Sequence, residues 1–290
     1  MRLASYHIHT TFCDGLDTPE RMVKAAIKAK VQELGFSAHS AWPLTTEWHL
    51  STTRFAEYID TVRSLQEKHK KRIRILCGFE ADYIPGVTAP DSSIYKQFSP
   101  DYLIGSIHML LSPSRKTSFG LWSVDGAVED VAHGLAQVFR GNGKRAVQLY
   151  WHTVREMVSS CDFDIVGHLD LIRKRNGVLH FFDENEGWYK RELAETVRTI
   201  ARSGKIVELN TGGMARKAID GLYPSDTLLS LLYKRNVPVT LSSDAHCADD
   251  LVFGYDSALA AARRAGYQEI HFLGRDGIEA VKIDTVGSSS

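Results

Sequence analysis

The feature that most constrains the fold is a repeated unit: a short apolar run, then a polar side chain able to bind a metal or a substrate, then a helix-like stretch. Residues 3–6 lead in this way to His7 and His9, and residues 237–241 lead to Asp244 and His246. Similar runs between them end at His39, Glu80, His108, His168 and Asn210. Strands that alternate with helices predict an α/β barrel or a parallel sheet. In such barrels the functional groups lie at the C-terminal ends of the strands, where all of these side chains are expected.

The spacing of the first and last of these residues indicates a metal site. In a strand, residues two apart point to the same face, so His7 and His9 aim together, as do Asp244 and His246. Converging nitrogen and oxygen atoms are typical metal ligands. One His-x-His alone could equally be a packed or solvated pair. Two such pairs, each at the end of a strand-like run, predict that metal binds here.

Composition and charge narrow the class of protein. The 290 residues are 43% hydrophobic, which is enough for one large core, and we expect a single domain over residues 1–290. Lys plus Arg and Asp plus Glu are both 35, so nothing favours nucleic acid or an anionic membrane as a partner. No apolar run approaches the length of a membrane span, and the start leaves no room for a signal peptide. The cysteines form no CxxC pair, which fits a reducing cytoplasm.

The motifs also resemble those of a known family. In chain order they are His-x-His at 7–9 followed by Thr-Thr-Phe-Cys-Asp-Gly, Gly-Phe-Ser-x-His-Ser at 35–40, Gly-Phe-Glu at 78–80, Gly-Ser-Ile-His at 105–108, Gly-His-Leu-Asp at 167–170, Glu-Leu-Asn-Thr at 208–211 and Ser-Ser-Asp-Ala-His at 242–246. This set resembles the PHP (polymerase and histidinol phosphatase) family, and within it the monofunctional histidinol-phosphate phosphatases. The resemblance runs from residue 3 to about residue 254. It implies a distorted TIM-like (β/α)7 barrel of the PHP type.

The same resemblance implies two or three divalent metal ions, zinc, iron or manganese, at the C-terminal rim. One ion would be bound by His7, His9, Glu80 and Asp244. A second would share Glu80 as a bridge and add His108 and His168, and a third would take His39 and His246. Many members supply a further histidine soon after the His-x-His. This chain has Phe-Cys-Asp-Gly there, so we expect the carboxylate of Asp14 to serve instead.

Several divalent ions held together favour hydrolysis of a phosphate ester. They lower the pKa of a bridging water, so that hydroxide is available at neutral pH, and they neutralise charge on the phosphoryl oxygens. No serine nucleophile is required, and no G-x-S-x-G elbow occurs in the sequence. The resemblance implies L-histidinol phosphate as the small-molecule substrate and histidine biosynthesis as the setting. Asp14, Asp244 or His246 would give the leaving alkoxide its proton, and the sequence does not choose among them.

Charged residues beyond two strand ends are candidates for substrate contact. Arg173 follows the run that ends at His168, and Arg216 follows Asn210. The planar guanidinium fork suits phosphate oxygens, so we expect both arginines to contact the phosphate. We expect Lys174 and Arg175 to be solvated loop charges. Asp170 is expected either to orient His168 by a hydrogen bond or to cap the strand end.

Three alternatives remain open. A PHP-type phosphoesterase could act on another phosphomonoester or on nucleotides, although the neutral charge offers no basic track for nucleic acid. An amidohydrolase-type enzyme also begins with His-x-His and ends with an aspartate. It usually has a modified lysine on a middle strand, where this chain has Glu80. A non-catalytic scaffold is disfavoured because the ligand set is complete. Comparing kcat/KM over a panel of phosphoesters distinguishes these cases.

Overall fold

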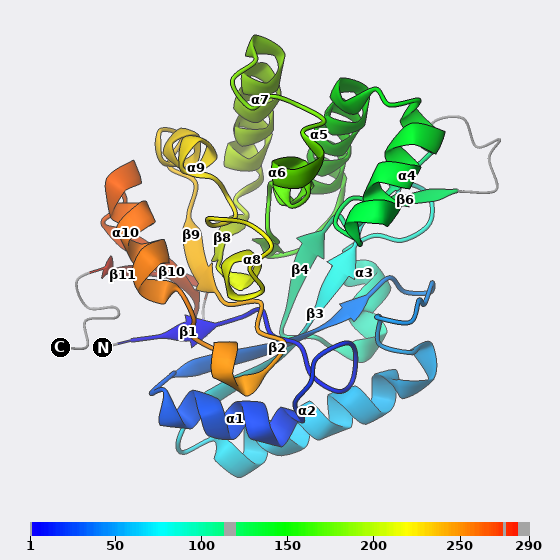
Figure 1. Ribbon diagram of the computed structural model, residues 1–290. Coiled ribbons are helices and arrows are strands. Elements are labelled where there is room, and N and C mark those ends of the chain that lie inside the picture. The colour runs from blue at the N-terminus through cyan, green and yellow to red at the C-terminus, as the bar shows by residue number, and fades with distance from the viewer. Residues whose placement is uncertain (1, 113–119, 275–276, 284–290) are drawn as a thin grey trace.

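A parallel sheet curls around the centre of the computed structural model, which describes residues 2–112, 120–274 and 277–283 (Figure 1). The sheet has seven strands in the order β1-β2-β3-β4-β7-β8-β9, and every pairing is parallel. The strands are β1 (Ala4–Ser5), β2 (Glu33–Ser40), β3 (Arg74–Asp82), β4 (Tyr102–Ser106), β7 (Ile165–Val166), β8 (Ile206–Asn210) and β9 (Val239–Ser242). Each lies within or overlaps an apolar run that the sequence predicts to be a strand.

The first and last strands meet just beyond their ends. Ile8 and Ala245 form an isolated parallel bridge, and the backbone N–H of His9 donates to the carbonyl oxygen of Ala245 at 2.8 Å. The sheet is therefore a nearly closed barrel, as predicted for a distorted TIM-like (β/α)7 fold. Closure also brings the residues that follow β1 next to those that follow β9, although more than two hundred residues separate them in the chain.

The strands are buried on both faces, which explains why they read as continuous apolar runs. All residues of β2, β4 and β8 are buried. Tyr102 of β4 fills space against β2 and β3, and its hydroxyl donates to the carbonyl oxygen of Phe36 at 3.1 Å. A Cβ at Gly35 would lie 2.4 Å from this hydroxyl, and one at Gly78 would lie 2.5 Å from the Tyr102 ring. Glycine therefore permits the close approach at both positions.

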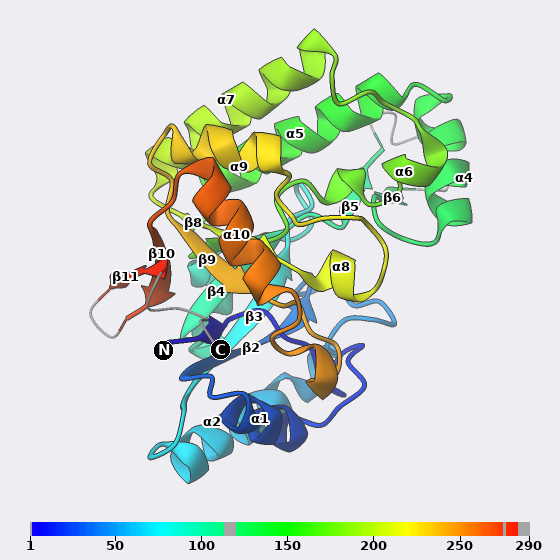
Figure 2. The same ribbon diagram turned by 60° about the vertical axis from the view of Figure 1, so that its left-hand side comes forward.

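Helices cover the outside of the barrel (Figures 1 and 2). The longer ones are α1 (Pro19–Lys28), α2 (Phe55–His69), α4 (Val128–Phe139), α5 (Gly143–Ser160), α7 (Gly187–Ser203), α9 (Asp226–Tyr233) and α10 (Tyr255–Ala265). Single turns are α3 (Ser92–Tyr95), α6 (Asn176–Leu179), α8 (Gly212–Ala215) and the 3-10 turns Thr52–Arg54, Lys96–Phe98, Leu171–Arg173 and Ala248–Asp250. α1 begins at a capping residue followed by proline: Thr18 accepts a hydrogen bond from the N–H of Arg21, and Pro19 is the first helical residue.

Two antiparallel strand pairs form small sheets separate from the barrel sheet. β5 (Met109–Leu111) and β6 (Leu121–Ser123) pair directly after β4, and β10 (Glu269–Leu273) and β11 (Ile278–Lys282) pair near the end of the chain. The backbone N–H of Val124 donates to the carbonyl oxygen of His108 at 2.9 Å. This bond fixes the exit of the first hairpin beside the end of β4.

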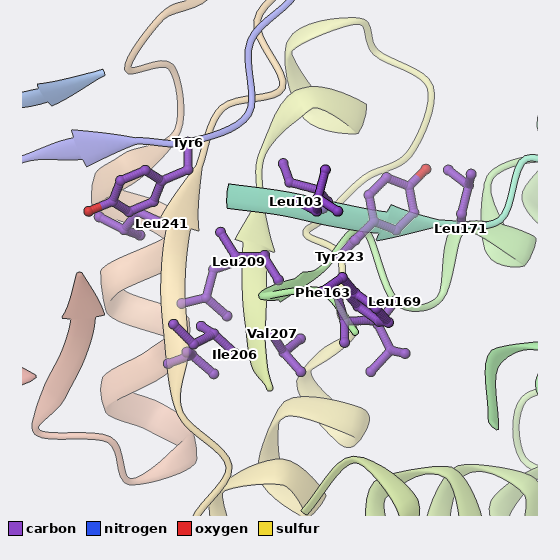
Figure 3. Packing of buried hydrophobic residues seen from close by; sticks show 14 of the residues in the cluster. Tyr6, Leu103, Phe163, Leu169, Leu171, Ile206, Val207, Leu209, Tyr223 and Leu241 are labelled. Carbon is purple, nitrogen blue, oxygen red and sulfur yellow. The ribbon is translucent and has the colours of Figure 1, made fainter. Parts of the chain in front are cut away.

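Buried side chains join the strands to the surrounding segments in a continuous core. Figure 3 shows Leu103 of β4, Leu209 of β8 and Leu241 of β9 within it, together with Phe163 and Tyr223. This packing holds the strand ends at one rim. Among the described residues, none of the helices has both the length and the apolar content needed to cross a membrane.

Candidate metal centre

The rim at the C-terminal ends of the strands gathers all of the side chains predicted to bind metal. Four groups of described residues have ligand atoms within 4.8 Å of one another: His9, Asp14, His39 and His246; His7, His168 and Asp244; His7, His9 and Glu80; and His39, Glu80 and His108. Sheet register explains part of this convergence, because His39 of β2 pairs directly with Glu80 of β3. The Ile8–Ala245 bridge explains another part, since it places the first histidine pair beside the last Asp-x-His.

Glu80 lies at the middle of the cluster. Its Oε2 is 3.0 Å from Nε2 of His7 and 2.8 Å from Nδ1 of His39. Its Oε1 is 2.7 Å from Nε2 of His168 and 3.4 Å from Nε2 of His108. The two oxygens thus face different pairs of histidines. A carboxylate placed in this way is suited to bridge two ions, which stays a prediction.

Buried polar atoms in the cluster fit a bound cation. Nε2 of His7, Nε2 of His9, Nδ1 of His39 and Oε2 of Glu80 are buried, and although they lie close to one another, none forms a hydrogen bond of good geometry with any described residue. A buried polar atom without a partner is costly, and native structures rarely keep several together. Imidazole nitrogens and a carboxylate oxygen that converge are the donors that zinc, iron and manganese accept. The residues present therefore fit metal ions.

The charges around Glu80 and Asp244 lower the pKa values of these two carboxyl groups. Burial acts to raise the pKa of Glu80, but His7, His39 and His108 hold it well below its usual range. Burial acts likewise on Asp244, whose pKa is held well below its usual range by Arg216 and His7. Both carboxylates are therefore ionised at neutral pH.

Two further buried carboxylates, those of Glu208 and Asp82, contact the candidate histidine ligands. Oε2 of Glu208 lies 2.9 Å from Nδ1 of His7, and Oε1 accepts from the backbone N–H of His168 at 2.7 Å. Oδ1 of Asp82 lies 2.5 Å from Nδ1 of His108. Such partners orient an imidazole and raise its basicity as a metal ligand. Neither carboxylate was predicted from the sequence to have a role. The available signal was spacing, because Asp82 is two residues after Glu80 and Glu208 is two before Asn210, so each pair shares a strand face.

Asp170 does not take this orienting position. Its Oδ2 accepts from the backbone N–H of Ser225 at 2.9 Å, and Arg173 lies 3.5 Å away. Its role among the described residues is to tie the end of β7 to the segment before α9, which is close to the strand-end alternative.

The three residues predicted to donate a proton differ in access. The side chains of Asp14 and His246 are 33% and 21% exposed, and Nε2 of His246 lies 3.3 Å from Oδ2 of Asp14. The side chain of Asp244 is only 6% exposed and is paired with Arg216. Asp244 also has a φ of 49°, a conformation that aspartate tolerates better than most residues. Its carboxylate is thus held in place, whereas the other two side chains are partly exposed at the cavity.

A cavity of about 350 Å³ opens over the cluster. It is lined by Asp14, His39, Trp48, His108, Met109, Ser123, Asp125, Gly126, His168, Leu171, Lys174, Arg216, Asp244 and His246. The volume suits a small molecule. The centroid of the Trp48 ring lies 4.8 Å from that of the His39 ring and 5.2 Å from that of the His108 ring, in edge-to-face geometry. An aromatic wall therefore stands directly beside the candidate ligands.

Of the two arginines predicted to contact a phosphate, one lines the cavity and the other does not. Arg216 lines the cavity, where Nη2 is 2.8 Å from Oδ2 of Asp244 and Nη1 donates to the Asp244 carbonyl oxygen at 2.8 Å. Arg173 is not among the described residues that line the cavity, because its Nε is held 2.9 Å from Oε2 of Glu184. Its geometry therefore does not support contact with a phosphate.

The expectation that Lys174 and Arg175 are solvated loop charges is wrong. Nζ of Lys174 lies 2.8 Å from Oδ2 of Asp125, and the lysine side chain is only 15% exposed at the cavity wall. Arg175 donates through Nε to the carbonyl oxygen of Gly126 at 2.7 Å. Both cations contact residues that directly follow β6, about fifty residues earlier in the chain.

Comparisons with known proteins agree with this geometry. The family model of the PHP domain matches residues 5–212. The chain is 27% identical over 279 residues to a protein of Deinococcus radiodurans named probable histidinol-phosphatase, covering 94% of this chain and 97% of that one. It is 25% identical over 276 residues to the histidinol-phosphatase of Bacillus subtilis, covering 87% and 97%.

Among solved structures, the histidinol phosphate phosphatase of Lactococcus lactis superposes with a TM-score of 0.69 at 20% identity. The match covers 96% of this chain and all of that one. That structure is a complex with zinc, L-histidinol and phosphate. At this identity the likeness establishes the fold, which is that of a PHP-type barrel.

Proposed function

The chain belongs to the PHP domain family, and from that premise we propose that it hydrolyses L-histidinol phosphate to L-histidinol and phosphate in histidine biosynthesis. The observation that carries the proposal is the convergence of histidine and carboxylate ligands beneath a cavity of small-molecule size. The names of the two relatives, which align over nearly their whole lengths, supply the substrate.

The metal content that we propose is two or three divalent ions. The first ion would be held by His7, His9, Glu80 and Asp244. The second would be held by Glu80, His108 and His168. The third would be held by Asp14, His39 and His246. When bound, the ions would lower the pKa of water and offset negative charge on the phosphoryl oxygens. Zinc is the first candidate, because the Lactococcus lactis protein of the same fold contains it.

The protein's own side chains would orient the ester. Arg216 and Lys174 are the cations at the cavity wall, and both would meet phosphoryl oxygens. Among the three candidates, His246 is better placed than Asp244 to give a proton to the leaving oxygen when it does not bind an ion, because its side chain is more exposed at the cavity. Burial acts to raise the pKa of Asp14, but His246 and His39 hold it well below its usual range, so Asp14 carries no proton at neutral pH. Trp48 would exclude water from one side of the bound ester.

The location that we propose is the cytoplasm. All four cysteines are free thiols, which suits a reducing compartment. The substrate is a small phosphate ester, and the formal net charge of zero gives no support for a nucleic-acid partner.

A substrate panel tests the activity. The protein is stripped of metal, reloaded separately with zinc, iron(II) or manganese(II), and assayed with phosphomonoesters and nucleotide diesters. L-histidinol phosphate should have the highest kcat/KM. The assignment fails if p-nitrophenyl phosphate is hydrolysed equally well or if a nucleotide diester is far better.

A further inference from the structure

An ion pair in the cavity wall has no part in the metal cluster. Lys174 follows the 3-10 turn after β7, and Asp125 follows β6; the two side chains meet at 2.8 Å and both line the cavity. Among the described residues, Asp125 belongs to none of the groups whose ligand atoms converge for a metal. A carboxylate that faces a cavity built for a phosphate ester repels the phosphate, and Lys174 offsets that charge from one side only, so a second cation at the exposed side of Asp125 is favoured.

The carboxylate is held in place by its surroundings. The N–H of Val124 is bound to the carbonyl oxygen of His108, and Arg175 donates to the carbonyl oxygens of Gly126 at 2.7 Å and of Asp125 at 3.3 Å. Lys174 fixes the side chain itself. The position of the Asp125 carboxylate relative to the candidate ligand His108 is therefore preorganised, as a binding group should be.

The carboxylate is also charged throughout the neutral range. Burial acts to raise the pKa of Asp125, but Lys174, His108 and His168 lower it to about 2. The side chain keeps 20% of its surface exposed, so a ligand in the cavity can reach it. The exposed part of this ionised carboxylate attracts a cationic group on a ligand that enters the cavity.

We propose that Asp125 is a specificity-determining residue that binds an ammonium group on the substrate, an inference that rests on the proposed function. In a phosphate ester of a vicinal amino alcohol, the carbon bearing the ammonium is bonded to the carbon bearing the ester oxygen. The two opposite charges are thus close together and match the Asp125–Lys174 pair, with Lys174 toward the phosphate and Asp125 toward the ammonium. The substrate class is phosphomonoesters of 2-amino alcohols.

The test uses two substrates that differ only in the amine. O-phosphoethanolamine and ethyl phosphate share the phosphate and the two-carbon chain, and each is assayed with the metal-loaded wild-type protein and with Asp125→Asn. The matched control is Asp60→Asn, which makes the same change at an exposed position on α2. Asp125→Asn should lower kcat/KM for O-phosphoethanolamine about 10- to 100-fold and leave that for ethyl phosphate within about two-fold. Asp60→Asn should change neither.

A loss of equal size for both substrates would overturn the proposal, because the carboxylate would then act only by holding Lys174. Unchanged rates for both would overturn it as well. Should Asp125→Asn fail to fold, inhibition of the wild-type protein decides. L-histidinol should inhibit about ten-fold more strongly than 3-(imidazol-4-yl)propan-1-ol, which lacks the amine, and equal inhibition refutes the ammonium contact.

These outcomes are separate from the fate of the proposed function. The O-phosphoethanolamine and ethyl phosphate pair contains no imidazole, so it reports on the amine alone. A protein that ignores L-histidinol phosphate but keeps the amine preference in an Asp125-dependent way would refute the proposed substrate and retain the ammonium site.

Discussion

Oδ1 of Asp82 lies 2.5 Å from Nδ1 of His108, and Oδ2 of the same carboxylate lies 3.0 Å from Nε2 of His49. Thr46 in turn contacts Nδ1 of His49 at 2.7 Å. The segment that carries Trp48 is therefore joined through one buried carboxylate to a candidate metal ligand. The Trp48 and His49 rings also lie 3.7 Å apart between centroids, which fixes the aromatic wall of the cavity against the same support.

Asp82→Asn should weaken metal binding at the site that includes His108. The neutral amide no longer raises the basicity of the imidazole, so we expect a loss of roughly 10- to 100-fold in metal affinity or in kcat/KM. Metal titration followed by kinetics measures both. His49→Gln should have the smaller effect, because Asp82 keeps its contact with His108. Equal losses in the two variants would mean that the Trp48 segment, rather than the histidine, is what Asp82 supports.

Glu80→Gln should lose metal as well as rate. Both carboxylate oxygens face histidines, and an amide is a poor bridge between two cations. The change keeps the volume of a fully buried side chain, so the fold should survive. We expect kcat/KM to fall roughly 100-fold or more. Elemental analysis is the decisive measurement, and full metal content in the folded variant would rule out the bridging role.

The sequence predicted the barrel and the convergence of its ligands because both depend on local pattern. Apolar runs fix the strands, and a polar residue where each run stops marks the rim. Strand length was less predictable. Residues 163–167 read as a strand, but only Ile165–Val166 pair in the sheet, since ladder pairing depends on neighbouring strands.

The supporting residues were harder to predict because their partners are distant in the chain. Lys174 looks like one charge in a basic run until Asp125 is seen beside it. His69 lies within a basic run, a pattern typical of a solvated side chain, yet it is buried and lies 3.6 Å from Glu20 of α1. Glu208 reads as a polar interruption of a strand until β7 and β1 bring His168 and His7 to it. Such roles follow from tertiary contacts, which single-chain spacing does not contain.

Metal binding should release protons at neutral pH. Burial acts to lower the pKa of His108, but Asp82 and Glu80 raise it to about 10 in the metal-free protein. Burial likewise acts to lower the pKa of His39, but Glu80 raises it above its usual value. An imidazole must be neutral to bind a metal, so each ion displaces protons below these pKa values, and the apparent affinity should increase as the pH rises toward about 10.

Isothermal titration with zinc in two buffers of different ionisation enthalpy measures this release. The apparent binding heat should differ between the buffers in proportion to the protons displaced. A heat that is the same in both buffers at pH 7 would show that the histidines are already neutral before the ion binds.

Arg216→Ala should reduce catalysis without removing the metals. Arg216 lines the cavity with a side chain that is 34% exposed, so part of the guanidinium is open to a phosphate while the rest holds Asp244. Loss of one charge-assisted contact should cost about 2–4 kcal/mol of transition-state binding, a fall in kcat/KM of roughly 30- to 1000-fold. Arg216→Lys should recover only part of this, because an ammonium lacks the two-pronged geometry.

The matched control for Arg216 is Lys217→Ala, which removes the neighbouring exposed cation from the same loop. It should leave kcat/KM near the wild-type value, because surface charge alone contributes little at physiological salt. Metal content should stay unchanged in both variants, since guanidinium does not bind metal and Asp244 retains its oxygens. Near-normal kcat/KM in Arg216→Ala would mean that Arg216 serves only to hold Asp244, and Lys174 would then be the better candidate for the phosphate contact.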